Sequence, residues 1–417
     1  MFDSLHFSNS FARLGEDFYS PVRAEPIADA RLVSVNPAAA SLVDLDDTAL
    51  ASADFIALMA GRQLPPGARP LASVYAGHQF GGYTPQLGDG RALLIGEVQN
   101  RQGQRWELQL KGAGQTPYSR FADGRAVLRS SIREYLCSEA MHSLGIPSTR
   151  AMALSTGSTP VYRERIESAA MVLRMAPSHI RFGHFEYFFH SGRHDCLQQL
   201  ADYVIEQHFP HCAGLPAPAR YQQWLLEVVE RTARLIADWQ AAGFCHGVMN
   251  TDNMSILGLT IDYGPFAFID DFDPGFVCNH SDSHGRYAYN RQVAIGLWNL
   301  NALAHALSPL IPVPALKDCL MQYEPVLLAR FRQRMQHKLG LATDQPGDDE
   351  LVGQLLQLLA AERRDYHDFF RRLGNIAAAE LATLDDSFVD RERWRSWRTG
   401  YQQRLAREDR DDSQRQA

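Results

Sequence analysis

An asparagine and an aspartate near the middle of the chain have the types and spacing of ligands for a divalent metal ion. Asn253 closes the segment 243–253, and Asp262 follows nine residues later in a short apolar run that ends in a Gly turn. Amide and carboxylate oxygens are hard ligands that suit Mg²⁺, which binds few protein groups and keeps phosphate oxygens in its coordination shell. The pair therefore predicts a metal site that handles phosphates.

The candidate proton acceptor of this site is Asp252, beside Asn253. Protein kinases carry a similar pattern, but in them an Asp five residues before the Asn is the base. That position is Val248 in this chain, and valine cannot accept a proton. A nearby cation would keep Asp252 ionised and able to act as a general base. The alternative is that Asp252 only caps or orients Asn253.

A lysine and a glutamate upstream extend the pattern. Lys111 ends the alternating strand predicted at 106–111, and Glu134 lies in a helix predicted at 130–143. The lysine can bind phosphate as a point charge, with Glu134 holding it in place. Each residue alone is as readily an ordinary surface charge, but the order of strand lysine, helix glutamate, Asn and Asp-x-Gly favours a functional site.

Two glycine turns are further candidates for contact with a nucleotide. Gly88, Gly90 and Arg91 follow a glycine-rich stretch and precede a predicted strand, where backbone N–H groups can approach phosphates and the arginine adds a cation. Asp123 and Gly124 form a similar turn just before the predicted helix. Either segment could equally be a plain turn.

Two arginines lie where two lobes of such a fold would join. Arg174 ends a strand predicted at 169–174, and Arg181 follows after a short segment. Guanidinium groups bind phosphate through a bidentate fork, so the pair indicates phosphates nearby. The alternative is that both pair with surface acids. The histidines between residues 179 and 211 lack the spacing of metal ligands, so a histidine metal site is not expected there.

The elements predicted from periodicity favour an α+β fold. Hairpins are expected at 92–111 and 160–176, and helices follow at 196–208, 219–242, 292–306, 314–338, 351–361 and 391–407. The expected domains are an N-terminal extension packed on the core, a small β-rich lobe with one helix, and a large helical lobe with a loose tail after Leu405, at residues 1–70, 71–176 and 177–417.

The composition limits the kinds of molecule that the protein is expected to bind. The net charge is −7, with 45% hydrophobic and 21% charged residues, so no broad basic surface for nucleic acid or membrane is expected. The first residues lack the cationic start of a secretory signal. Six scattered cysteines without a Cys-x-x-Cys pair indicate a reducing compartment and argue against a structural zinc site. The expected location is the cytoplasm.

Four longer runs, at 106–114, 123–134, 177–183 and 246–254, closely resemble the selenoprotein O family. The resemblance implies a protein-kinase-like fold that moves AMP from ATP onto Ser, Thr or Tyr hydroxyls of proteins, with ATP inverted and with Mg²⁺ or Mn²⁺. It implies Asp252 as proton acceptor, Asn253 and Asp262 as metal ligands, and nucleotide contacts from Gly88, Gly90, Arg91, Lys111, Asp123, Gly124, Arg174, Arg181 and Asp262, with Glu134 in support.

Other functions stay open at this point. They are transfer of phosphate, as in a kinase, transfer of UMP, and a catalytically dead pseudokinase that binds nucleotide as a scaffold. Family members commonly end near a redox-active Cys or selenocysteine, whereas no cysteine follows Cys319 here.

Overall fold

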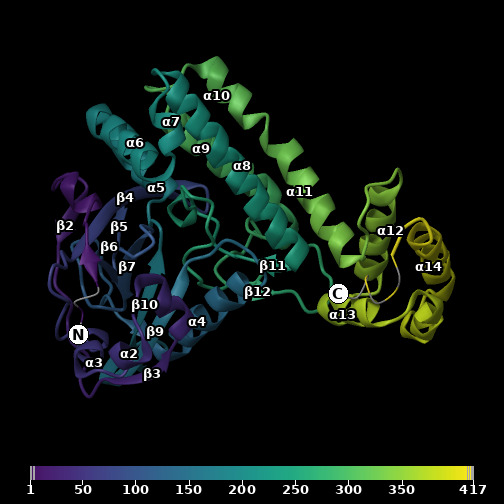
Figure 1. Ribbon diagram of the computed structural model, residues 1–417, viewed down its shortest axis with the longest axis horizontal. Coiled ribbons are helices and arrows are strands. Elements are labelled where there is room, and N and C mark those ends of the chain that lie inside the picture. Colours follow the sequence, from purple (N-terminus) through teal and green to yellow (C-terminus); the bar gives the residue numbers. More distant parts are fainter. Residues whose placement is uncertain (1, 3–4, 411, 413, 415–417) are drawn as a thin grey trace. The chain divides into compact units, whose positions relative to one another are not determined.

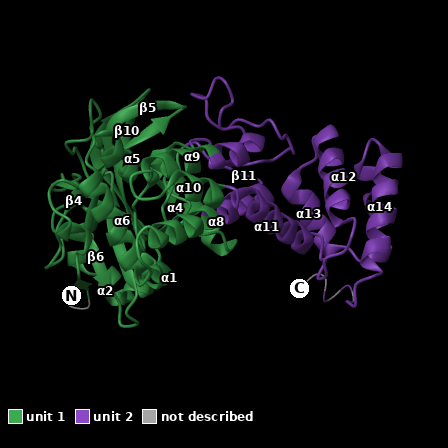
Figure 2. Cartoon of the chain, turned by 90° about the horizontal axis from the view of Figure 1, so that it is seen from above, with its two compact units in different colours: residues 1–231, 249–264, 298–320 green, residues 232–248, 265–297, 321–417 purple. Residues whose placement is uncertain are grey.

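The structure is a computed structural model that describes residues 2, 5–410, 412 and 414. It divides into two compact units (Figure 2), residues 1–231, 249–264 and 298–320 in the first and residues 232–248, 265–297 and 321–417 in the second. These units are not the two lobes expected from the sequence, and the lobe boundaries stay a prediction.

The first unit is built on a large antiparallel sheet of ten strands (Figure 1), which confirms the α+β class. The path through the sheet is β2-β4-β6-β7-β10-β9-β3, and β1, β5 and β8 pair at its side. The strands are β1 (His6–Phe7), β2 (Tyr19–Pro21), β3 (Arg31–Val35), β4 (Leu71–Gln79), β5 (Gly82–Gly88), β6 (Ala92–Gln99), β7 (Arg105–Lys111), β8 (Ala126–Val127), β9 (Arg150–Tyr162) and β10 (Ile166–Ala176).

Both predicted hairpins are present. In the first, β6 pairs with β7 so that Ala92 lies opposite Lys111, and in the second, β9 pairs with β10. The N-terminal segment joins the same sheet, because β2 pairs with β4 and β3 pairs with β9. Residues 1–70 therefore contribute strands to the sheet as well as packing on it.

Helices pack against the sheet and make up most of the chain after it. In the first unit, α4 packs on β9 and β10, and α5 packs on β4. The helices of the first unit are α1 (Pro37–Ala40), α2 (Asp47–Leu50), α3 (Ala53–Met59), α4 (Leu128–Ser143), α5 (Phe182–His190), α6 (His194–His208), α7 (Pro210–Ala213) and α10 (Val313–Leu320). Two further helices, α8 (Ala219–Ala242) and α9 (Gln292–Ala306), belong partly to each unit. Helices α8 and α9 match their predicted bounds.

Helix α4 is confirmed, but its apolar stripe is buried only in part, at Met141. Leu136 is 61% exposed and Ile132 is also exposed, whereas Glu134 and Cys137 are buried. The helix therefore turns a carboxylate toward the sheet in place of its leucine. The cause is the set of cations that meet Glu134 there.

The second unit has its own core, in which the aromatic rings of Phe388, Trp394, Trp397 and Tyr401 stack in sequence. Its elements are β11 (Phe244–Cys245), β12 (Ala267–Phe268), α11 (Tyr323–Lys338), α12 (Asp348–Ala361), α13 (Tyr366–Asn375) and α14 (Arg391–Leu405). The single helix predicted at 314–338 is two helices, α10 and α11, separated by a turn.

The tail expected to be loose begins inside this unit. Glu408 accepts hydrogen bonds from Thr343 and pairs with Arg404, so the start of the tail is tied to the fold. Residues 411, 413 and 415–417 of that tail lie outside the described part. Among the described residues, no helix is both long and apolar enough to cross a membrane.

Candidate active site

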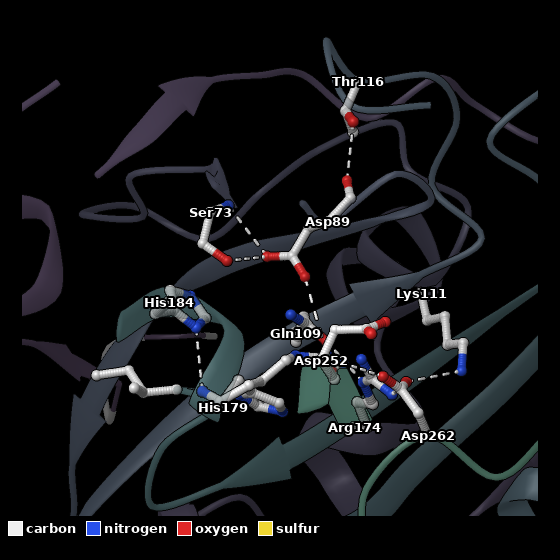
Figure 3. Close-up of polar contacts among 12 residues, drawn as sticks. Ser73, Asp89, Gln109, Lys111, Thr116, Arg174, His179, His184, Asp252 and Asp262 are labelled. Carbon is white, nitrogen blue, oxygen red and sulfur yellow. Dashed lines mark hydrogen bonds and ion pairs between the residues drawn. The ribbon is translucent and has the colours of Figure 1, made fainter. Parts of the chain in front are cut away.

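Lys111 reaches the site because it is the last residue of a buried strand. It is buried, and its Nζ donates to Glu134 Oε2 at 2.6 Å. The same Nζ donates to Asp262 Oδ1 at 3.2 Å (Figure 3). The salt bridge expected between the strand lysine and the helix glutamate is therefore present. Burial lowers the pKa of Lys111, although both carboxylates oppose that shift.

Asp262 is the acceptor on which three cations converge. It takes the left-handed conformation, with φ of 57°, and its carboxylate accepts from Lys111, from Arg174 Nη1 at 2.6 Å, and from Arg181 Nη1 in a short contact. Burial alone would raise its pKa, but the charges of Arg181, Arg174 and Lys111 outweigh burial and hold the pKa well below its usual range. The carboxylate is therefore ionised at neutral pH.

The two arginines are buried and each is fixed by a second partner. Arg174 lies opposite Gln109 across β10 and β7, and it donates to Gln109 Oε1 at 2.6 Å and to Glu134 Oε1 at 3.1 Å. Arg181 lies over the Tyr75 ring, 5.0 Å from its centroid, and donates to the backbone oxygen of Asp252 at 2.8 Å. Both planar groups are held at fixed positions beside Asp262.

We refer to Lys111, Glu134, Arg174, Arg181 and Asp262 as the Asp262 cluster. It contains three cations and two carboxylates, and Asp89 adds a third carboxylate 3.9 Å from Arg181. Buried cations need counterions, and an anionic ligand with several oxygens can replace a side-chain carboxylate in that role. The cluster can therefore bind a phosphate chain if Asp262 turns to another partner.

Asp252 lies beside the cluster on the short 3₁₀ turn Thr251–Asn253. Its Oδ2 accepts from Gln79 Nε2 at 3.1 Å, while its Oδ1 is buried and has no hydrogen-bond partner among the described residues. Burial raises its pKa to about 6. A buried carboxylate oxygen without a donor is suited to a metal ion or to the hydroxyl of an incoming substrate.

The end of strand β4 fixes the loop that carries Asp252. The backbone N–H of His78 donates to Thr251 Oγ1 at 2.7 Å, and Thr251 makes a short hydrogen bond to Glu186. His78 Nδ1 lies 2.5 Å from the other oxygen of Glu186. Gly77 also lies against Asp252, since a Cβ at Gly77 would be 2.6 Å from Asp252 Oδ1. Sequence reasoning missed these contacts because no local signal joins residues so far apart in the chain.

The donor set fits a divalent metal ion. Asp262, Asn253 and the unpaired oxygen of Asp252 are hard oxygen donors of the kind that Mg²⁺ and Mn²⁺ take. Both oxygens of Asp262 are engaged by cations here. Binding a metal through Asp262 therefore requires other anions to neutralise Lys111, Arg174 and Arg181.

The predicted glycine turns have different surroundings. Gly88 ends β5, and a Cβ there would lie 2.4 Å from the Tyr118 ring, so this glycine admits a neighbouring loop. Arg91 is exposed, but its positive charge contributes to the lowered pKa of Lys111. Asp123 makes a bidentate pair with Arg163 at 2.8 and 2.9 Å in place of joining the Asp262 cluster.

The turns beside these residues are closed by hydrogen bonds to their backbone carbonyls. The carbonyl of Gly124 accepts from the N–H of Gly114 at 3.2 Å, and the carbonyl of Gly90 accepts from the hydroxyl of Ser119. Contacts of Gly88, Gly90, Arg91, Asp123 and Gly124 with a nucleotide stay predictions.

Comparisons with known proteins agree over nearly the whole chain. A family model described as Protein adenylyltransferase SelO matches residues 1–417. The chain is 54% identical over 407 residues to the protein nucleotidyltransferase YdiU of Pseudomonas fluorescens. The aligned region covers 97% of this chain and 83% of the relative. It is 53% identical over 418 aligned positions to the protein of the same name from Myxococcus xanthus. That alignment covers 100% of this chain and 85% of the relative.

The charge balance of the Asp262 cluster generates a stability prediction. Glu134→Gln keeps the shape of the side chain but removes a counterion of Lys111 and Arg174, so that these two cations and Arg181 must share Asp262. We expect the free energy of unfolding to fall by about 3–5 kcal/mol, because a buried ion has lost its counterion. Urea unfolding followed by circular dichroism measures the change.

The matched control is Asp349→Asn, which removes a carboxylate paired with Arg332 at the surface. Solvent screens that pair, so the control should unfold close to wild type. Equal stability of Glu134→Gln and wild type would show that Glu134 is not a required counterion.

Proposed function

The chain belongs to the protein adenylyltransferase SelO family, and we propose that it transfers AMP from ATP to Ser, Thr or Tyr hydroxyls of other proteins. The observation that carries this proposal is the convergence of three buried cations on Asp262. Such a concentration of positive charge suits the β- and γ-phosphates of ATP, which leave together as pyrophosphate when AMP is transferred.

We further propose a kinase-like arrangement of two lobes around this site. The supporting features are a lysine at the end of an antiparallel strand, its ion pair with a glutamate on the next long helix, and an Asn and an Asp on later loops. The lobes would meet near Arg174 and Arg181.

The same arginines support an inverted pose for ATP. A kinase-like hinge normally faces an adenine, whereas Arg174 and Arg181 offer fixed guanidinium groups to anions. In the proposed pose, the γ-phosphate lies against these arginines and Lys111, and the adenosine lies toward the outside. The α-phosphorus is then placed toward the loop that carries Asp252.

Each residue has a role in the proposed transfer. Asp252 accepts the proton of the attacking hydroxyl, and Gln79 holds its other oxygen. The hydroxyl oxygen forms a bond to the α-phosphorus, the bond between that phosphorus and the bridging oxygen to the β-phosphate breaks, and pyrophosphate leaves. Lys111, Arg174 and Arg181 neutralise its charge.

A divalent metal ion, Mg²⁺ or Mn²⁺, would supply further neutralisation of the phosphates when bound by Asn253 and Asp262. Metal binding at Asp262 would need an exchange of partners, because both of its carboxylate oxygens accept from cations. If phosphates take over the three cations, the Asp262 carboxylate would become free to bind the metal. Gly88, Gly90 and Arg91 are proposed to line the phosphates, and Asp123 and Gly124 the opposite side.

Phosphate transfer, UMP transfer and nucleotide binding without catalysis are the competing functions. The valine at position 248 weakens the case for an ordinary kinase, because the usual base is missing. The experiment that separates these functions incubates the protein with a protein acceptor and ATP labelled at either the α- or the γ-phosphorus. AMP transfer moves only the α-label, a kinase moves the γ-label, and a scaffold moves neither. UTP labelled at the α-phosphorus tests UMP transfer.

In the same assay, Asp252→Asn should lower transfer of the α-label by roughly a hundredfold or more, which is typical for loss of a general base. ATP binding, measured by calorimetry, should stay near that of wild type, because the proposed metal ligands Asn253 and Asp262 are unchanged and the proposed role of Asp252 is toward the acceptor hydroxyl. If the mutant binds ATP and transfers AMP at a rate within a few-fold of the wild-type rate, Asp252 is not the general base and only positions its neighbours.

The close approach of Gly77 to Asp252 yields a second variant. Gly77→Ala places a methyl group 2.6 Å from Asp252 Oδ1, which is too close, so Asp252 must shift. A shift of about 1 Å at a reacting group can cost on the order of a hundredfold in rate. We expect kcat to fall while the KM for ATP changes little.

The matched control is Gly82→Ala in the partner strand, where the nearest atom to the new methyl is 3.6 Å away. This control should keep wild-type kcat. Loss of activity in both variants, or in neither, would contradict the claim that Gly77 leaves room for Asp252.

A further inference from the structure

Three side chains of different types converge between α7 and α8, away from the residues of the Asp262 cluster. His211 Nε2 lies 2.5 Å from Glu227 Oε1, and Cys212 Sγ lies 3.7 Å from the same oxygen. The three ligand atoms all lie within 4.8 Å of one another. The spacing of the histidines gave no sign of this group, because its other members are a cysteine and a glutamate.

We propose that His211, Cys212 and Glu227 form a binding site for Zn²⁺ or a chemically similar divalent cation. Zinc bonds of about 2.0–2.3 Å in a tetrahedral arrangement place neighbouring ligand atoms roughly 3.3–3.7 Å apart. The sulfur and the carboxylate oxygen already have such a separation. The imidazole must move away from that oxygen by about 1 Å, which a small rotation supplies because the His211 side chain is 57% exposed.

The charges of the three groups also suit a divalent cation. A thiolate and a carboxylate together neutralise two positive charges, and the imidazole binds in its neutral form. Burial, with the neighbouring Glu227, raises the pKa of the Cys212 thiol to about 11, so the thiol is protonated without metal. Metal binding therefore releases a proton from Cys212.

Neighbouring residues orient the carboxylate for this role. Arg231 packs over the Phe209 ring, and its Nη2 lies 3.6 Å from Glu227 Oε2. The oxygen that faces His211 and Cys212 also accepts a long hydrogen bond from Gln223 Nε2 at 3.4 Å, which a metal ion would replace, while Arg231 steadies the other oxygen. Three protein ligands leave one tetrahedral position for water.

The donor set distinguishes this site from the one proposed at Asp262. Sulfur and nitrogen donors favour Zn²⁺ over Mg²⁺, whereas Asp262 and Asn253 offer only hard oxygens. A bound ion would tie the short helix α7 to the long helix α8. The expected consequence is higher thermal stability with Zn²⁺, independent of nucleotide.

Titration of the metal-free full chain with Co²⁺, a spectroscopic substitute for Zn²⁺, tests the proposal. We expect one equivalent to produce the visible bands of tetrahedral Co²⁺ with a near-ultraviolet thiolate-to-metal charge-transfer band, and Zn²⁺ to displace it. Cys212→Ser should remove the charge-transfer band. His211→Ala, at an exposed position that does not threaten folding, should weaken binding tenfold or more.

Two controls identify the ligands. His142→Ala removes another exposed histidine and should bind as wild type does. Cys278→Ser tests the neighbouring thiols of Cys278 and Cys245, whose Sγ atoms lie 3.6 Å apart, and this variant should also keep the band. The proposal is overturned if wild type gives no thiolate band, if the band survives in Cys212→Ser, or if His211→Ala binds as tightly as His142→Ala.

Discussion

The burial of three cations around one carboxylate is the constraint on which the rest of the first unit depends. Lys111, Arg174 and Arg181 are each nearly inaccessible to solvent, so their charges must be balanced within the protein. Asp262 balances all three, and Glu134 balances two of them. The left-handed backbone at Asp262 and the rotation of α4 are both consistent with this demand.

That arrangement links a structural requirement to a proposed function. A cluster balanced by its own carboxylates is stable without ligand, and a chain of phosphates can take the place of Asp262 in it. In the proposed function, Asp262 would then become available to a metal at the same time as the three cations become available to phosphates. The proposed reaction draws on this coupling, because a nucleotide both neutralises the cations and frees the carboxylate that holds its metal.

Local patterns in the sequence were sufficient for much of the fold. Alternating residues predicted the β6–β7 and β9–β10 hairpins, and helical periodicity predicted the bounds of α8 and α9, since these signals act over a few neighbouring residues. The pairing of Lys111 with Glu134 followed from recognising the order of motifs. The single helix predicted at 314–338 was wrong because a short turn does not interrupt an otherwise helical composition.

Contacts between distant segments could not be predicted in this way. The buried face of α4 is set by charges that arrive from β7 and β10, so Glu134 is buried while the apolar Ile132 and Leu136 are exposed. The support of Asp252 by Gln79, and of its loop by Glu186, depends on the packing of β4 and α5. The meeting of Cys212 with Glu227 likewise requires the turn between α7 and α8.

The central claim is that the Asp262 cluster binds the phosphate chain of ATP. A crystal structure of the full chain with Mg²⁺ and an ATP analogue that cannot be cleaved between the α- and β-phosphates tests it most directly. The account predicts phosphate oxygens within hydrogen-bond distance of Lys111, Arg174 and Arg181, with the Asp262 carboxylate turned from the arginines to the metal. An adenine ring against Arg174 and Arg181, with Asp262 still paired to both, would contradict it.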